Sequence, residues 1–281
     1  MDAFTTPLLT GSATGAILLM AALGLTLTFG QMGVINMANG EFLMAGAYAT
    51  YVTQQVITGT GISVIAAIPV AFLVTGLLGL LLEVTVIQWM YKRPLDTLLA
   101  TVGVALVLQQ LARDLFGAQG DPVVPPSWLG GSIDVFGYAW PHRQLFTIVL
   151  ALAAVGLLHA GLKYTPFGRQ IRATVQNREL AETVGITTRN VDRITFFVGS
   201  GLAGLGGALG AEVLGLDPTF PLKFMIYFLI VCSVGGTTTI TGPLLAALLL
   251  GIFDVAGKYY VPKLGAFFVY SLMIVILMVR P

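Results

Sequence analysis

Apolar stretches long enough to cross a membrane recur along almost the whole chain, and they limit its fold more than any other feature. A transmembrane α-helix needs about 17–25 predominantly apolar residues. The apolar stretches cover residues 13–30, 41–58, 62–90, 97–116, 145–162, 194–215, 225–236, 243–257 and 264–279. The third is long and the seventh is short, so we expect about eight to ten crossings.

The composition requires that much of this apolar surface faces lipid. Of the 281 residues, 56 % are hydrophobic and 10 % are charged, and the mean hydropathy is +0.89. A soluble domain carries about 25 % charged residues, and its core could not hide this much apolar surface from water. We therefore expect an all-α, polytopic membrane helix bundle with broken or re-entrant segments, forming one transmembrane domain over residues 1–281.

Several functional classes are disfavoured by the sequence. The net charge of +1 argues against a nucleic-acid partner. The single cysteine, Cys232, excludes an internal disulfide and a cysteine metal cluster, and His142 and His159 are not spaced as metal ligands, so we expect no metal site. No Gly-x-x-x-x-Gly-Lys-[Ser/Thr] phosphate loop is present, which argues against nucleotide hydrolysis by that route. The N-terminus lacks a basic leader, so the first apolar stretch is expected to be a retained span.

Basic residues predict the orientation of the bundle. They lie in the 92–93 turn, in the 163–193 loop and at Arg280, and the positive-inside rule places all three in the cytoplasm. This orientation puts the loop 117–144 and the N-terminus outside, although re-entrant segments would change the N-terminal side. The loop 117–144 is rich in proline, glycine and aromatic residues. It is expected to be either an ordered lid on the bundle or a docking surface for an extracytoplasmic partner.

Residues 30–42 place polar groups between two apolar stretches. Asn36, Asn39 and Glu41 lie there beside several glycines, including Gly40, that allow a helix to break. Polar side chains at membrane depth are costly unless they are paired or face a cavity, and transporters build solute sites at broken helices. We expect these residues to line a substrate pathway, with a purely structural role as the alternative.

A second interruption lies at residues 234–243, where Gly235 and Gly236 precede a run of threonines and a proline. Paired interruptions in the two halves of a transporter indicate a binding site between them. Gly235 and Gly236 are therefore also expected to contribute to the pathway. A cytoplasmic turn is the open alternative, because the two halves of the chain show no clear repeat.

The basic loop 163–193 contains a pattern typical of a short docking helix. Residues 178–184 suit a helix, and Gly185 fits its C-terminal stop. A short helix held between two spans can enter a groove on a soluble partner, whereas the alternative is a loop whose charge only sets the orientation. The residues expected to make this contact are Arg178, Glu179, Ala181, Glu182 and Gly185.

The other polar residues of the spans are expected to be structural. Glu83 is predicted to snorkel or to pair with the basic 92–93 turn, and Gln109 belongs to a polar cluster at the outer end of its span. Asp254 and Lys258 are four residues apart, the spacing of an ion pair on one helix face.

Small residues recur through the apolar stretch 194–215. Ser200 lies between two glycines, which invites comparison with an intramembrane serine protease, but no histidine follows it to act as a base. Residues 204–210 are similar to a dinucleotide-binding motif, yet no strand precedes them. Small residues four apart instead predict close packing of helices.

Two of these segments together resemble one family. Residues 34–41, Val-Ile-Asn-Met-Ala-Asn-Gly-Glu, resemble the Asn-Phe-Ala-His-Gly-Glu stretch of the branched-chain amino acid (Liv-type) permeases of bacterial ABC importers. Residues 166–173 and 180–186 look like the ATPase-coupling loop of that family, whose Glu-Ala-Ala-x-x-x-Gly pattern Glu179, Ala181 and Gly185 match in part. Residues 93–99 and the two glutamines after Leu108 look closer to its urea-type branch.

The resemblance, which runs from about residue 14 to the C-terminus, implies a multi-pass permease subunit in the bacterial inner membrane. Its implied partners are a second permease subunit (identical or different), two cytoplasmic ATPase subunits that hydrolyse ATP, a periplasmic solute-binding protein and membrane lipid. The chain itself is expected to hold no cofactor and to catalyse no reaction. The expected solutes are branched-chain amino acids or related small polar molecules, with urea or a short amide as the alternative.

A stand-alone secondary transporter or channel is the rival of another class, although a full relay of buried acids and histidines is missing. Three features depart from the family pattern. Asn39 replaces the usual histidine, so a role for an imidazole cannot be carried over. The threonine run at 237–239 is unusual, and the chain stops at Pro281 before the usual Gly-Leu-Phe tail, which predicts a truncated C-terminus.

Overall fold

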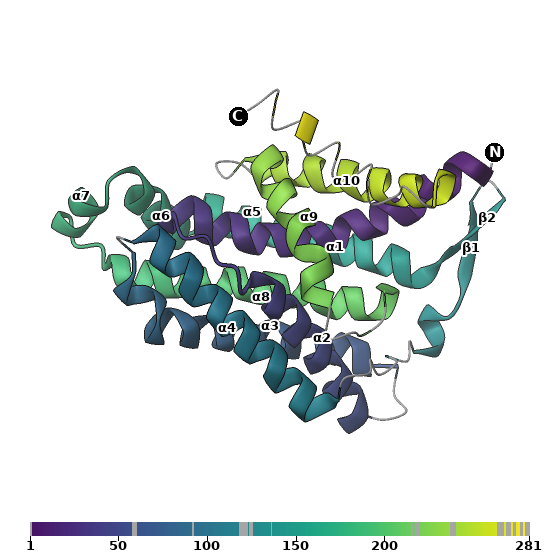
Figure 1. Cartoon of the computed structure of the whole chain (residues 1–281), viewed down its shortest axis with the longest axis horizontal. Coiled ribbons are helices and arrows are strands. Elements are labelled where there is room, and N and C mark those ends of the chain that lie inside the picture. The colour runs from purple at the N-terminus through teal and green to yellow at the C-terminus, as the bar shows by residue number, and fades with distance from the viewer. Residues whose placement is uncertain are drawn as a thin grey trace.

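The computed structural model describes residues 2–57, 61–91, 93–117, 126–135, 137–214, 220–236 and 240–262, and the single residues 123, 216, 267, 271, 274, 275 and 278. Helices dominate this part of the chain (Figure 1). In order, its helices and strands are α1 (Asp2–Met32), α2 (Asn39–Val56), α3 (Ser63–Thr85), η1 (Ile87–Trp89), α4 (Pro94–Phe116), η2 (Ser127–Leu129), β1 (Ser132–Val135), β2 (Tyr138–Pro141), α5 (His142–Tyr164), α6 (Pro166–Gln176), α7 (Arg178–Thr183), α8 (Thr188–Leu214), α9 (Phe220–Gly235) and α10 (Thr241–Tyr260).

The predicted all-α membrane bundle is confirmed. In the described residues, six helices are long and apolar enough to cross a membrane, namely α1, α3 with η1, α4, α5, α8 and α10. A shorter apolar helix lies within α9, and α2 coincides with the expected span at 41–58 although it is not one of the six. Each expected span up to residue 257 therefore corresponds to one helix. The last expected span, 264–279, falls almost entirely outside the described residues.

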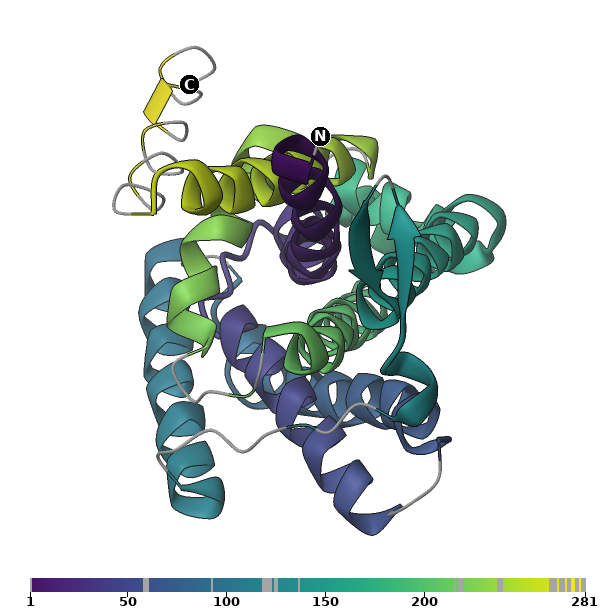
Figure 2. The same cartoon turned by 90° about the vertical axis from the view of Figure 1, so that its right-hand side faces the viewer.

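Two long helices form the centre of the bundle. The membrane-spanning windows of α1 and α8 are 78 % and 83 % buried, whereas those of α4 and α5 are 28 % and 17 % buried. Figure 2 shows α1 and α8 side by side, with α10, α5, α3 and α4 around them. The outer helices expose large apolar side chains, such as Leu99, Val107 and Leu157. The surface of these outer helices is therefore the surface that faces lipid.

Small residues bring α8 close to its neighbours, which confirms the packing interpretation of the 199–211 stretch. A methyl group added to Gly46 on α2 would lie 2.1 Å from the carbonyl oxygen of Gly204 on α8. One added to Gly207 on α8 would lie 1.7 Å from the carbonyl oxygen of Leu43 on α2. These helices therefore meet backbone to backbone, as small residues four apart allow in membranes.

Two structured connections lie at opposite ends of the bundle. Strands β1 and β2 pair antiparallel, with Ser132 opposite Pro141, and they lie beside the N-terminus at one end (Figure 1). The hydroxyl groups of Thr10 and Tyr138 are 3.1 Å apart there. Helix α7 protrudes at the other end (Figure 1). This arrangement agrees with the prediction that the loop 117–144 and the loop 163–193 lie on different sides of the membrane.

The loop 163–193 is more ordered than the sequence predicted. The expected helix over 178–184 is confirmed as α7, but a second helix, α6, precedes it and was not predicted. Helix α6 begins at a proline and is capped by the hydroxyl of Thr165, which accepts a hydrogen bond from the backbone N–H of Gly168. Its amphipathic pattern places Ile171 in contact with the bundle and Arg172 at the surface. The 163–193 loop is thus a pair of short helices that joins α5 to α8.

Candidate functional site: a broken helix and a coupling helix

The break between α1 and α2 is built by a glycine and an asparagine. Gly33 ends α1 with a left-handed φ of +65°, a backbone conformation that favours glycine. Asn36 then begins the return of the chain: its side-chain oxygen accepts a hydrogen bond from the backbone N–H of Ala38 at 3.0 Å. This is the short-range bond by which asparagine forms turns. Asn36 is buried, so the turn lies inside the protein.

Asn39 fixes the start of α2 beside the middle of α1. Its side-chain amide donates a hydrogen bond to the carbonyl oxygen of Ala21 at 3.0 Å. Because Ala21 lies eleven residues before Met32, α2 begins about 16 Å back from the end of α1. The hydroxyl of Thr101 on α4 also accepts a bond from the N–H of Met37 at 3.1 Å. The break is thus a re-entrant segment whose polar groups bond to neighbouring helices.

Glu41 is the buried carboxyl group of this segment. Its Oε1 accepts a hydrogen bond from the side-chain amide of Gln109 on α4 at 2.7 Å, while its Oε2 is buried without a hydrogen-bond partner in the described part of the chain. The first turn of α2 favours a negative charge because of the helix dipole. The sequence does not indicate Gln109 as a partner of Glu41, since no local pattern links residues that are 68 positions apart.

Gly40 allows α9 to approach the same turn. A methyl group added to Gly40 would lie 3.2 Å from the side chain of Pro221, at the start of α9. Gly235 lies at the other end of α9, where an added methyl group would lie 2.4 Å from the backbone nitrogen of Pro243. Gly236 ends α9 with a left-handed φ of +75°. The two glycine positions, Gly40 and Gly235, are therefore separated by the length of α9, about 21 Å between Pro221 and Gly235.

The structure thus brings Asn36, Asn39, Gly40 and Glu41 together, and it places Gly235 and Gly236 in the turn between α9 and α10. The threonine run at 237–239 lies outside the described residues. A shared role of both breaks in one pathway remains a prediction.

Helix α7 is a capped, protruding unit. The side-chain oxygen of Asn177 accepts a hydrogen bond from the N–H of Leu180 at 3.0 Å, and Gly185 ends the helix with a φ of +88°. The predicted stop at Gly185 is confirmed. Ala181 is buried against the bundle, whereas Leu180 and Val184 are 62 % and 75 % exposed. Exposed leucine and valine side chains at the tip of a bundle are suited to contact with another protein.

The inner side of α7 is joined to α8 by a buried ion pair. The guanidinium group of Arg178 bonds to the carboxylate of Asp192, whose side chain is fully buried. Glu182 lies 4.0 Å from the Arg178 guanidinium and accepts a hydrogen bond from the hydroxyl of Thr188 at 2.5 Å. Of the residues predicted to contact a partner, Arg178 and Glu182 therefore also fix α7 to α8. Glu179 is exposed.

The same arginine reaches α3 through an aromatic ring. The guanidinium carbon of Arg178 lies 5.2 Å from the ring centre of Tyr91, and the Tyr91 hydroxyl donates a hydrogen bond to Glu83 at 2.7 Å. Burial raises the pKa of Tyr91, and the bond to Glu83 raises it further, so the phenol keeps its proton. Glu83 also lies 3.4 Å from Arg193 on α8. The predicted snorkelling of Glu83 is wrong, because its side chain is fully buried and contacts Tyr91 and Arg193. The alternative pairing with Lys92 lies outside the described residues.

Another predicted ion pair is confirmed on α10. Lys258 lies 2.6 Å from Asp254, and the hydroxyl of Tyr227 on α9 donates a hydrogen bond to the same carboxylate at 2.9 Å. Asp254 and Lys258 therefore have a structural role, and the hydrogen bond from Tyr227 joins α9 to α10.

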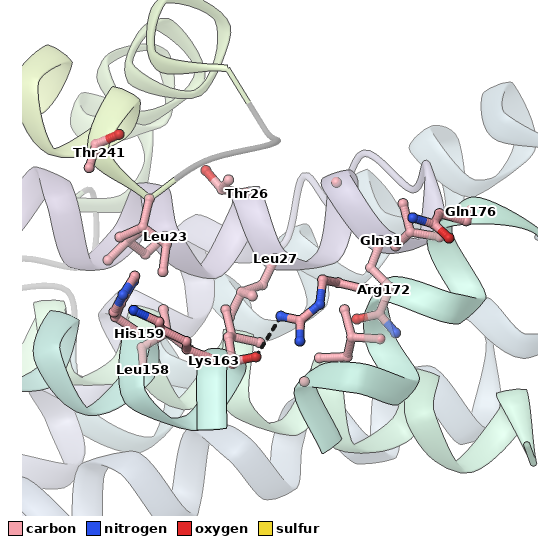
Figure 3. Close-up of a pocket in the computed structure, with 16 residues that line it drawn as sticks. Leu23, Thr26, Leu27, Gln31, Leu158, His159, Lys163, Arg172, Gln176 and Thr241 are labelled. Atoms are coloured by element: carbon pink, nitrogen blue, oxygen red, sulfur yellow. Dashed lines mark hydrogen bonds between the residues drawn. The ribbon is translucent and has the colours of Figure 1, made fainter. Parts of the chain in front are cut away.

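A cavity of about 640 Å³ lies between α1, α5, α6 and the start of α10. Figure 3 shows side chains of these helices around it, including Gln31, His159, Lys163 and Arg172. Asn36, Asn39 and Glu41 are not among its lining residues. The cavity is instead lined by Gly30 and Gln31 of the 30–42 segment and by Ile240 and Thr241 of the 234–243 segment.

These features define the class of protein. A multi-pass helix bundle with a polar re-entrant break, and with a short exposed helix at one end, has the parts of a membrane transport permease. The family model described as the branched-chain amino acid transport system / permease component matches residues 8–277, and the chain belongs to this family.

The relatives match most of the length of this chain. It is 24 % identical to the high-affinity branched-chain amino acid transport permease LivH of Salmonella typhimurium, over 99 % of this chain and 94 % of that protein. It is 29 % identical to a probable LivH of Methanocaldococcus jannaschii, over 87 % and 78 %. It is 28 % identical to the autoinducer 2 import permease LsrC of Photorhabdus laumondii, over 83 % and 68 %. No solved structure matches the chain significantly.

Proposed function

We propose that the chain is the transmembrane permease subunit of a binding-protein-dependent ABC importer for branched-chain amino acids or related small polar solutes. Family membership and the names of the LivH relatives support this assignment. The observation that carries it is the exposed helix α7, which is linked by Arg178 to α8 and by Tyr91 to α3. A helix held in this way can pass a movement of a soluble partner into the bundle.

The proposed partners follow from the two ends of the bundle. Two cytoplasmic ATPase subunits hydrolyse ATP and receive Leu180 and Val184 of the two permease subunits, which are identical or different chains. A periplasmic binding protein delivers solute at the opposite end, near β1 and β2. The chain itself holds no cofactor and catalyses no reaction, and it lies in the bacterial inner membrane.

The proposed mechanism couples α7 to the broken helix. Closure of the ATPases displaces α7, the pair of Arg178 and Asp192 transmits the displacement to α8, and α8 moves against α2 across their backbone contact. Asn36 and Asn39 hold the break, while the partner-free Oε2 of Glu41 is complementary to the ammonium group of an amino acid.

Uptake of radiolabelled leucine into proteoliposomes tests this proposal, using the chain with its cognate ATPases, second permease and binding protein. Glu41→Ala and Glu41→Gln are expected to abolish uptake and to leave insertion in the membrane unchanged. Glu212→Gln is the matched control, because Glu212 is a second buried carboxylate that bonds a glutamine of α2, here Gln54 at 3.4 Å. Normal uptake by the Glu41 variants, or equal loss in the control, would refute the role of Glu41.

A further inference from the structure

The cavity between α1, α5 and α6 combines an apolar wall with a basic rim. Leu23 and Leu27 of α1 and Leu158 and Leu162 of α5 form the wall. Lys163 lies at the end of α5, at the rim of the cavity. Its volume of about 640 Å³ is within the range of about 300–1,000 Å³ that is typical of ligand sites. The site is therefore large enough for part of an amphipathic molecule.

The rim carries positive charge without a counter-charge. Lys163 and Arg172 take part in no ion pair within the described residues, and no aspartate or glutamate lines the cavity. His159 lies one helical turn from Lys163 on the same face of α5. Figure 3 shows these three side chains around one opening. Uncompensated cations near a membrane attract anionic groups.

The arginine is held in place before any ligand binds. One guanidinium nitrogen of Arg172 donates a hydrogen bond to the carbonyl oxygen of Leu162 at 2.7 Å, at the free C-terminal end of α5. Helix α6 lies close against the end of α5, because an added methyl group on Gly168 would lie only 1.9 Å from the same oxygen. The remaining guanidinium N–H groups stay available for an anion.

A buried side-chain amide beside the cavity lacks hydrogen-bond partners in the described part of the chain. Both polar atoms of the Gln31 side chain are buried and have no hydrogen-bond partner in the described part of the chain, and Gln31 lines this cavity. Buried polar groups without partners are rare in proteins, and each one calls for an explanation such as a bound molecule. A ligand with hydroxyl or phosphate oxygens would satisfy this amide.

We propose that the cavity binds an anionic phospholipid, with Lys163 and Arg172 contacting the phosphate and the leucines of α1 and α5 contacting an acyl chain. The surface of α5 next to it faces lipid, as the 75 % exposure of Leu157 indicates. The site lies at the end of the bundle that carries the basic loop, so the lipid belongs to the cytoplasmic leaflet; this placement rests on the proposed function. An amino-acid solute fits less well, since its ammonium group would find no carboxylate in the cavity.

Native mass spectrometry of the purified full chain tests the proposal, with phosphatidylglycerol and phosphatidylcholine as the lipid probes. Retention of phosphatidylglycerol is expected to exceed that of phosphatidylcholine, and to fall about fivefold for each of Lys163→Gln and Arg172→Gln. Leu158→Trp keeps both charges but narrows the cavity, and it is also expected to lower retention. The control is the pair Arg169→Gln and Arg189→Gln, which removes two exposed charges of the same loop that do not line the cavity.

Each outcome of this measurement either supports or excludes the proposed lipid site. Loss in the cavity variants with retention in the control supports the site. Equal loss in the control would show that the loop attracts anionic lipid by its overall charge, and unchanged retention in the cavity variants would exclude the site. Displacement of phosphatidylglycerol by leucine would identify a solute site instead. The measurement needs no transport, so failure of leucine uptake would overturn the proposed function and leave this proposal standing.

Discussion

Separating the buried pair of Arg178 and Asp192 tests whether α7 and α8 move together. Arg178→Met leaves the fully buried carboxylate of Asp192 without its cation. Removing one partner of a buried ion pair costs about 3–5 kcal/mol. The Arg178 side chain is 40 % exposed, and water screens such a pair, so we expect a smaller loss of about 2 kcal/mol in the free energy of unfolding.

The double variant Arg178→Met with Asp192→Leu separates stability from coupling. Replacing both charges by apolar side chains of similar size recovers most of the stability of a buried pair. A loss of about 2 kcal/mol corresponds to a decrease of about 4–8 °C in Tm, so the single variant should show this decrease and the double variant should recover most of it. Leucine uptake per ATP hydrolysed should stay low in both variants, because neither retains the charged link between α7 and α8.

The assays are Tm of the purified complex by tryptophan fluorescence, and ATP hydrolysis and uptake in the same proteoliposomes. The control is Arg93→Met with Asp96→Leu, which removes an exposed pair whose side chains are 76 % and 51 % accessible and should change neither Tm nor coupling appreciably. Wild-type uptake per ATP in the Arg178–Asp192 double variant would refute the proposed linkage. An unchanged Tm in the single variant would refute the expected stabilisation.

Three further predictions concern the break, the packing and the docking surface. Gln109→Leu removes the hydrogen bond to Glu41 and should lower the maximum rate of leucine uptake at least about tenfold with normal insertion; an unchanged rate argues against this bond. Gly46→Val should lower Tm by several degrees because its methyl groups meet the α8 backbone, while Gly103→Val, with nothing within 4 Å, should not; equal Tm values contradict the contact. Leu180→Asp should abolish co-purification of the ATPase subunits, and unchanged co-purification excludes α7 as their docking site.

The features that could be predicted from the sequence are local ones. The long apolar stretches predicted the membrane-spanning helices, because a helix that crosses a bilayer needs a minimum number of apolar residues whatever the surrounding fold. Gly185 stops α7 as predicted, since the left-handed backbone of a helix end favours glycine. Asp254 and Lys258 pair as predicted because one helix turn separates them.

The contacts that could not be predicted join distant parts of the chain. Glu41 bonds Gln109 across 68 positions, and Glu83 contacts Arg193 of a distant helix. Spacing along one helix indicates which residues share a face, but the choice of a neighbouring helix depends on how the whole bundle packs. Helix α6 was missed for a different reason: in the 163–193 loop only residues 178–184, which a glycine follows, were interpreted as a helix.

The bond between Asn39 and Ala21 has a consequence for how the chain responds to acidity. The side-chain amide of Asn39 donates one hydrogen bond to the carbonyl oxygen of Ala21 on α1. A primary amide keeps both hydrogens at every physiological pH, whereas an imidazole gains or loses a proton near neutrality. In this chain the bond between Asn39 and Ala21 contains no titratable group, so a change of pH does not alter this contact directly.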